Sequence, residues 1–566
     1  MNWPAPHPAL GYSIGIVGHR RDRIEDVEAV SNRIRETIAT VEGALAQSGA
    51  SGLYPAGRKP LRLVSALAEG ADRLAAAVAL EAGVKLEVVL PFVASEYRKD
   101  FGDEASREEF DRLLGQAATV MVLDGNADDR TRAYEAAGLV LLSNCDLLVA
   151  VWDGGPGRGR GGTREVIGEA ARRWIPIVVI DPAGVAAKVR SAGSGAGPQR
   201  LDDVPELPLG ALSDLIVAEV GFDDGPEAAA LWFREAEPPR EPIIHGAYPL
   251  LLKLAGVGPK RRPRTARKAD SPAEPVADPT SLRDAFAWWD QVAVQAAQAF
   301  RSAVIVNFSL AALAVVLAAT SLLVGQAKWI FVLAEVITIL LLTANTAGAG
   351  RRRWQERWLE SREVAELLRV CSMLRQVGIG RGIADPGQGG MLGWYAGAYA
   401  RSGTLEHVDL SDAAVAGALL VDEVRGQAEW NAATSRRMHL AARRIERFGE
   451  ALFAAVLVAA VGWLLLYFFV PQTAIALRYV LTAITAGFPA LATASYGIRI
   501  ILDFEGIAQR TGRIGSGLDA LLVRWAADAP SAARLQEFAR NAADIMLGDI
   551  AAWRLLTEGR RLTIPG

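Results

Sequence analysis

Cysteine is scarce in this chain, with Cys145 and Cys371 the only two among 566 residues. They stand in different segments, which excludes a disulfide framework and any cysteine-based metal spacing, so we predict no metal site. An excess of one charge is also missing, because 61 basic residues stand against 64 acidic ones. This balance argues against bulk nucleic-acid binding. Residues 1–20 lack a basic region followed by a long apolar core, so we expect no secretory signal and a cytoplasmic first domain.

Residues 12–182 alternate short β-branched runs with amphipathic stretches. We predict strands at 12–18, 61–67, 85–92, 119–125, 146–152 and 175–181, with helices at 23–46, 71–82, 107–117, 131–143 and 164–174. This alternation predicts an α/β fold with a Rossmann-like parallel sheet covered on both faces. Ligands of such sheets bind beyond the carboxyl ends of the strands, near the point where strand order reverses.

The residues at these strand ends combine glycine amides, cations, an aromatic ring and carboxylates, a mixture that suits a nucleotide. The candidate ligand-binding residues are Gly18, His19, Arg20, Ser65, Glu69, Gly70, Asp72, Trp152, Asp153, Gly154, Gly161, Gly162, Thr163 and Glu165. Simpler roles stay open for three of them. His19 can be a turn residue, Asp72 can cap the helix that follows it, and Trp152 can be a packing aromatic.

The segment 145–165 runs from an apolar strand through a glycine-dense loop into a helix, an arrangement that binds phosphates, although a flexible surface loop is the alternative. A Walker A motif fails here, because Thr163 stands where lysine is required. A literal GxGxxG occurs at Gly157, Gly159 and Gly162, with Asp181 further on. However, this motif lies well beyond the end of the strand. The sequence also shows no second catalytic domain to receive a hydride, so we do not expect a dehydrogenase.

Residues 12–182 resemble the SLOG superfamily of Rossmann-like domains, and in particular its LOG branch. The resemblance rests on IVGHR at the first strand, SALAEGADRLAA after the second, VVLPF at the third, and CDLLVAVWDG followed by GGTRE. It implies binding of a nucleotide or nucleotide-derived ligand, with phosphate held by Gly161, Gly162 and Thr163. Some LOG-branch members are phosphoribohydrolases, and Glu165 matches the motif glutamate. The proline that usually precedes two glycines is displaced to Pro156, which weakens the case for catalysis more than that for binding.

Beyond residue 182 the chain divides into an extension of the sensor domain (183–256), a proline- and charge-rich linker (257–280) and a helical membrane domain (281–566). Four apolar segments, about 302–324, 329–349, 451–470 and 474–498, are each long enough to span a bilayer. They form two hairpins with helical arms. Basic clusters at 351–353 and 436–447 place both termini and the arms in the cytoplasm, with the hairpins crossing the inner (plasma) membrane.

Three polar residues fall in or near these spans. Glu335 and Arg478 lie near the outer ends, where a pathway role, a mutual ion pair and interfacial snorkelling all stay open. Asn307 is expected to hydrogen-bond between helices.

The helical half also shows a faint internal duplication. In each copy a tryptophan-bearing helix enters a membrane hairpin and a charged helix leaves it. This half resembles SLATT, the SMODS and SLOG-associating two-transmembrane effector domains. The resemblance lies in the pattern Trp354, Arg357, Arg362, Glu366 and Arg369, followed by LGWYAGAYAR and GQAEWNAAT.

The two resemblances imply a nucleotide-sensing membrane effector of bacterial antiphage defence, in which ligand binding activates a membrane-disrupting or pore-forming domain. The expected partners are a nucleotide signal, the lipid bilayer and further copies of the chain, with no nucleic acid and no cofactor beyond the ligand. One alternative is a membrane-anchored nucleotide-processing enzyme, a phosphoribohydrolase or NAD-like hydrolase with Glu165 as its catalytic carboxylate. Another is a nucleotide-regulated channel or transporter.

Overall fold

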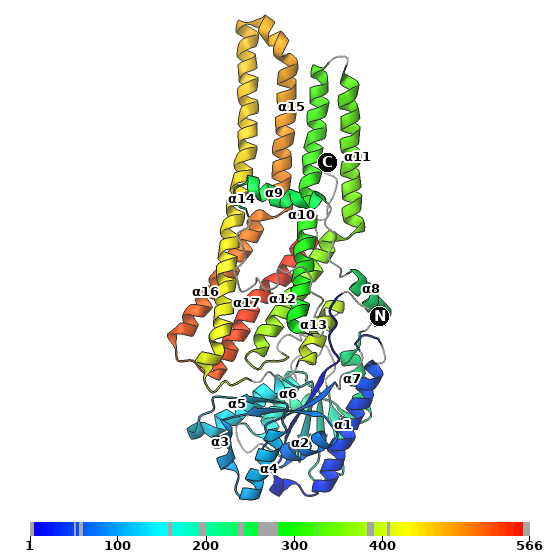
Figure 1. The fold of residues 1–566 in the computed structure, drawn as a ribbon, viewed down its shortest axis with the longest axis vertical. Coiled ribbons are helices and arrows are strands. Elements are labelled where there is room, and N and C mark those ends of the chain that lie inside the picture. Colours follow the sequence, from blue (N-terminus) through cyan, green and yellow to red (C-terminus); the bar gives the residue numbers. More distant parts are fainter. Residues whose placement is uncertain are drawn as a thin grey trace.

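The computed structural model describes residues 5–49, 52–55, 60–156, 161–191, 200–222, 224–235, 243–258, 281–324, 327–381, 390–403 and 408–558. Almost all of the predicted linker, and Gly157 and Gly159 of the glycine loop, lie outside these residues. An α/β domain occupies one end of the elongated molecule, and long helices extend from it to the other end (Figure 1).

The α/β domain is built on one eight-stranded sheet with the order β4-β3-β2-β1-β5-β6-β7-β8. Its strands are β1 (Tyr12–Gly18), β2 (Leu61–Ser65), β3 (Lys85–Leu90), β4 (Thr119–Val122), β5 (Leu147–Val151), β6 (Ile177–Ile180), β7 (Ala187–Arg190) and β8 (Glu206–Pro208). The six predicted strands are present and pair in parallel. The α/β class is therefore confirmed.

Beyond the six predicted strands, β7 and β8 add to the sheet in antiparallel orientation, so the sheet is mostly rather than wholly parallel. The reason is the short connection between β6 and β7. The carboxylate of Asp181 accepts hydrogen bonds from the backbone N–H groups of Ala183 (3.0 Å), Val185 (3.3 Å) and Ala186, and so holds this connection in a tight turn. A turn of this length joins only antiparallel neighbours.

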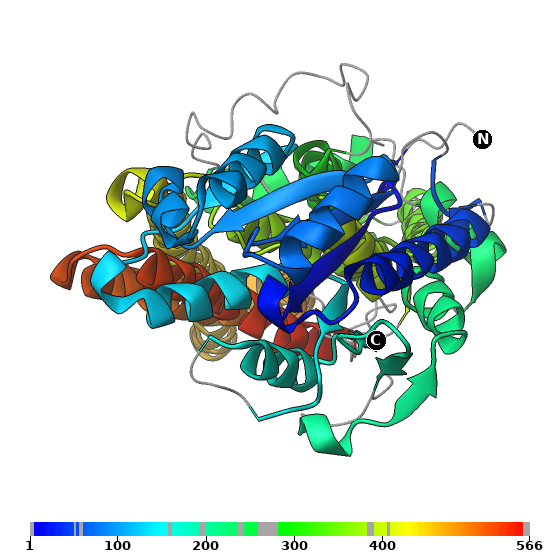
Figure 2. The same ribbon diagram turned by 90° about the horizontal axis from the view of Figure 1, so that it is seen from below.

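Helices cover both faces of the sheet. They are α1 (Val27–Gly49), α2 (Ala71–Glu81), the short α3 (Ala94–Tyr97), α4 (Glu104–Gly115), α5 (Arg130–Leu142), α6 (Thr163–Arg172) and α7 (Ala211–Val220). Along β5, Leu147, Val149 and Val151 belong to the core cluster of α1, α2 and α7, whereas Leu148 and Ala150 belong to that of α5 and α6. This alternation buries the strand on both faces, and Figure 2 shows the sheet between its covering helices.

The helical half contains α10 (Leu282–Thr320), α11 (Lys328–Arg351), α12 (Trp354–Arg375), α13 (Met391–Ser402), α14 (Ala413–Phe469), α15 (Pro471–Ile501), α16 (Phe504–Ala527) and α17 (Ala532–Glu558). Among the described residues, four helical segments are long and apolar enough to cross a membrane, and they contain the four predicted spans to within a residue at their ends. Helix α14 is about 85 Å long at 1.5 Å per residue, far more than a hydrocarbon core of about 30 Å. Its N-terminal part therefore extends outside the apolar zone as an arm.

The segment 183–256, predicted as an extension of the sensor, divides between the two halves. Strands β7 and β8 and helix α7 complete the α/β domain. Helices α8 (Gly225–Glu235) and α9 (Ala247–Leu254) pack instead on the helical half, where Phe233 of α8 lies 5.8 Å from the ring of Tyr395.

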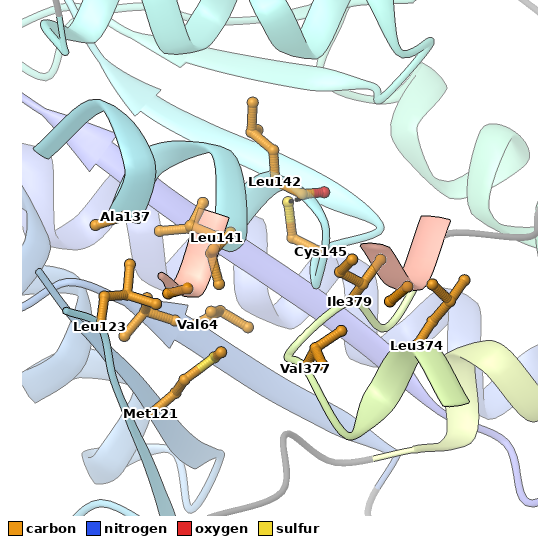
Figure 3. Close-up of a cluster of buried hydrophobic side chains, with 14 of the residues drawn as sticks. Val64, Met121, Leu123, Ala137, Leu141, Leu142, Cys145, Leu374, Val377 and Ile379 are labelled. Atoms are coloured by element: carbon orange, nitrogen blue, oxygen red, sulfur yellow. Dashed lines mark hydrogen bonds between the residues drawn. The ribbon is translucent and has the colours of Figure 1, made fainter. Parts of the chain in front are cut away.

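The hydrophobic core continues from the sheet into the helical half. Figure 3 shows Cys145 beside Ile379, in one cluster that also contains Met121 of β4, Leu141 of α5 and Leu374 near the end of α12. All five side chains are at least 98% buried. The two halves are thus packed together rather than only tethered by the chain.

Candidate functional site

Strand order reverses between β1 and β5, and the predicted site residues gather beyond this point. Gly18 pairs with Val151 at the carboxyl ends of the two strands, and the N–H of His19 donates to the carbonyl of Val151 at 3.0 Å. The segments after Gly18 and Val151 therefore lie side by side. This is where an open α/β sheet places its ligand crevice.

His19 and Asp153 meet directly at this edge. Nε2 of the buried His19 lies 3.2 Å from the backbone N of Asp153 and 3.1 Å from its Oδ1. A neutral ring accepts from the N–H, whereas a protonated ring donates to the carboxylate, so the contact serves either protonation state. Arg23 pairs with the other carboxylate oxygen. Although partial burial opposes ionisation, hydrogen bonds from Gly155 N–H and His19 and the charge of Arg23 hold the pKa of Asp153 below its usual value.

Gly70 brings the loop after β2 against the end of β1. Its φ is +99°, and a Cβ there would overlap the carbonyl oxygen of His19 and the backbone of Arg20. The next residue, Ala71, donates its N–H to that same carbonyl at 3.1 Å. Only glycine permits this approach, which holds the loop after β2 against the end of β1.

The glycine loop enters α6 beside the same edge. Thr163 Oγ1 donates to the carbonyl of Gly18 at 3.2 Å, which ties the start of α6 to the end of β1. Gly162 precedes the helix and provides no side-chain cap, so the first-turn amides of α6 supply the positive end of a helix dipole. The cation Arg20 is exposed at this edge. Together these groups form a place where an anion such as a phosphate is stabilised.

Glu165 takes a structural role in the loop. Its Oε2 accepts the backbone N–H of Gly161 at 2.7 Å, one residue before the N-cap residue Gly162. Gly161 itself has φ +76° and packs against α5. The only described candidate for a catalytic carboxylate in this loop is thus already used to hold the loop in place.

Two other predicted ligands serve the turn after β2 instead. Ser65 Oγ accepts the N–H of Leu67 at 3.0 Å, and Leu67 has the unusual φ of +55°. Asp72 is 5% exposed; burial raises its pKa to about 7, against the opposing effect of hydrogen bonds from the backbones of Ala68 and Ala66. Both side chains stabilise a strained turn from within. Asp72 does not cap α2, because Gly70 is the N-cap residue and the carboxylate accepts N–H groups of the preceding turn.

The remaining candidates are divided between the core and the surface. Trp152 is buried in the α5 and α6 core, which is the packing role left open for it. Glu69 accepts a hydrogen bond from Ser106 of α4. Gly154 has φ +78° and open space around it. Asp181, the possible ribose ligand of a dinucleotide motif, is used in the β6–β7 turn described above.

A second cluster of charged groups, which sequence reasoning missed, lies at the opposite, amino edge of the sheet. Arg381, from the segment after α12, lies 3.3 Å from Asp146 and 2.8 Å from Glu219 of α7, and donates to the carbonyl of Cys145 at 2.7 Å. Asp146 also accepts the N–H of Ser13 at 2.7 Å. This contact locks the sheet to the helical half. No local motif marks it, because its members are far apart in the sequence.

In the apolar helices, Asn307 forms the expected bonds between helices, donating to Thr346 Oγ1 at 2.8 Å and accepting from Asn345 at 2.7 Å. The ion pair considered for Glu335 and Arg478 is not formed. Arg478 instead donates to the hydroxyl of its neighbour Tyr479 at 2.9 Å. Within the described residues, no group of three or more His, Cys, Asp or Glu side chains forms a possible metal site.

Comparison of the chain with protein-family models, with curated proteins and with solved structures finds no match. The resemblance to SLOG and SLATT therefore rests on the motifs quoted above alone.

Proposed function

We propose that this protein is a nucleotide-responsive membrane effector. Its α/β domain binds a nucleotide-derived ligand at the carboxyl edge of β1 and β5. Binding activates the helical half, which disrupts or permeabilises the membrane. The resemblance to SLOG and SLATT supports placing this activity in bacterial antiphage defence.

The observation that carries the proposal is the meeting of three features at the strand-order reversal. These are the uncapped start of α6, the exposed Arg20 and the paired His19 and Asp153. Amides and a cation suit phosphate, and a carboxylate beside a histidine suits a ribose hydroxyl. The engagement of Glu165 with Gly161 favours binding over turnover.

Helix α6 offers a route from the ligand to the helical half. Its buried residues Val166 and Ala170 belong to the same core cluster as Phe538 and Ala542 of α17. Helix α17 in turn contacts α12, α14 and α16. A ligand that binds one placement of α6 more tightly than another shifts the equilibrium between two arrangements of these helices.

The four apolar helices belong in the inner membrane under this proposal, with the α/β domain and both termini in the cytoplasm. The basic residues Arg351–Arg353 at the end of α11 and the basic stretch 436–447 of α14 lie on the side of the α/β domain (Figure 1). That is the cytoplasmic side by the positive-inside rule.

Binding and turnover are separable in one experiment. The purified full chain in detergent is titrated with a panel of nucleoside monophosphates, NAD and cyclic dinucleotides, and each mixture is then analysed for free base. Arg20→Gln removes the exposed cation and should weaken binding about tenfold to a hundredfold, as expected for a charged hydrogen bond. The control Arg35→Gln, on the exposed face of α1, should leave binding unchanged.

Glu165→Gln decides between the sensor and the enzyme. The sensor proposal expects bound nucleotide to be recovered intact from both the wild type and this variant. Steady release of free base by the wild type that Glu165→Gln abolishes, with binding retained, contradicts the proposal and establishes the phosphoribohydrolase or hydrolase alternative.

A further inference from the structure

The internal duplication is visible in the backbone of the helical half. Helix α11 is followed by Arg353 with φ +50°, and α15 by Asp503 with φ +51°. Each of these left-handed residues directly precedes an arm helix, and each arm begins with a buried aromatic residue, Trp354 or Phe504. Non-glycine residues rarely adopt this conformation, so two at matching places mark two copies of one unit.

The matched residues align the two hairpins. Asn345 and Ser495 stand at the same spacing before Arg353 and Asp503. Asn345 contacts Asn307 of α10, and Ser495 lies against Gly449 of α14. Helix α11 thus corresponds to α15, and α10 corresponds to α14 with Asn307 matched to Gly449.

The main contact between the two hairpins involves only one helix of each. Helix α10 of the first unit packs on α15 of the second, where a Cβ on Gly487 would meet Val316 and a Cβ on Gly497 would overlap Phe308. The hairpin helices therefore form the row α14, α15, α10, α11, with α14 and α11 outermost (Figure 1). The outer helices are the counterparts of the two that meet in the middle.

The counterparts of the buried contact residues are exposed. On α10, Ala312 and Ala319 are buried and Val316 is half-buried. Their counterparts on α14 are exposed, with Val458 at 72%. Ala454 corresponds to Ala312, Val461 to Ala319 and Val458 to Val316. On α11, the counterparts of Gly487, Ala494 and Gly497 are Ile337, Ala344 and Ala347, all of which are exposed.

We infer that α14 of one copy of this chain docks on α11 of the next, and so repeats between copies the contact that α10 and α15 make within one copy. A second copy is the occupant because the same structural unit already buries this surface once, and small residues on α11 permit close approach of helices in a bilayer. The interface joins different surfaces of the two copies, so it propagates head to tail, and we propose that it closes into a ring of hairpins. This contact is independent of the nucleotide.

Cysteine cross-linking tests the interface on the full chain. Ile337→Cys and Val458→Cys are made in separate chains, which are co-expressed in membranes and oxidised. The native cysteines do not interfere, because Cys145 and Cys371 are both buried. Gly487 and Val316 are the counterparts of Ile337 and Val458 within one chain. A Cβ at Gly487 would lie 3.3 Å from the Val316 side chain. That is compatible with disulfide geometry. We expect a disulfide-linked dimer in the mixture and none with either variant alone.

The control pairs Ile339→Cys, on another side of α11 and similarly exposed, with Val458→Cys. A chain carrying both Ile337→Cys and Val458→Cys should give a ladder of cross-linked species ending at a fixed size. Equal cross-linking of the Ile339 pair, dimers of a single variant, or the absence of cross-links in the Ile337 mixture would overturn the interface. Because no ligand is added, none of these outcomes bears on nucleotide sensing.

Discussion

Replacing Arg381 by methionine should loosen the contact between the α/β domain and the helical half. The substitution leaves Asp146, which is 2% exposed, and Glu219 without their shared cation. Removing one partner of a buried ion pair lowers the free energy of unfolding by about 3–5 kcal/mol. The lower value applies because the Arg381 side chain is about one-fifth exposed. A loss of about 3 kcal/mol raises the open fraction of this contact about a hundredfold.

Cys145 reports that opening directly. Its side chain is fully buried beside Ile379, and burial raises the pKa of its thiol to about 12, so alkylation requires the contact to open (Figure 3). In a Cys371→Ser background, the maleimide labelling rate should rise about a hundredfold in Arg381→Met. The control Arg425→Met breaks the exposed pair with Asp422 and should change the rate less than about fivefold. Equal rates in the two variants would refute the coupling role of Arg381.

Three further perturbations test the crevice and the spans. Because the folded-state pKa of Asp72, about 7, lies above its ordinary 3.8, the folded chain binds more protons between these values. Stability should therefore fall by about 1.2 kcal/mol per pH unit on average as pH rises from 5 to 7, and Asp72→Asn should remove this slope in urea titrations. Gly70→Ala forces a Cβ onto the end of β1 and should destabilise by more than 2 kcal/mol, whereas Gly52→Ala, also at positive φ but in open space, should cost about 1 kcal/mol. Asn307→Ala should lower stability in bicelles by about 1 kcal/mol, and Thr343→Ala, which loses only a bond within its own helix, should have a smaller effect.

Local pattern was enough to predict the six parallel strands and the four apolar spans. Alternating β-branched runs and long apolar runs are properties of neighbouring residues, and burial acts on them directly. Strand order brought Gly18, His19 and Asp153 together as the general rule for open sheets expects. Whether these residues bind a ligand stays a prediction.

The roles of individual side chains were harder to predict, because they depend on distant or opposing neighbours. Asp181 and Glu165 both matched ligand motifs, yet their carboxylates accept backbone N–H groups that only the folded loop presents. Arg381 carried no motif at all. Its partners come from the start of β5 and from α7, and only the packing of the two halves brings them to it.

The most direct test of the account is dye release from liposomes containing the full chain, with nucleotide added on the side of the α/β domain. We predict saturable release in response to at least one nucleotide, complete recovery of that nucleotide afterwards, and a response shifted about tenfold or more to higher concentration in Arg20→Gln. Intact vesicles in the presence of a nucleotide that demonstrably binds, or release that proceeds identically without any nucleotide, would contradict the central claim.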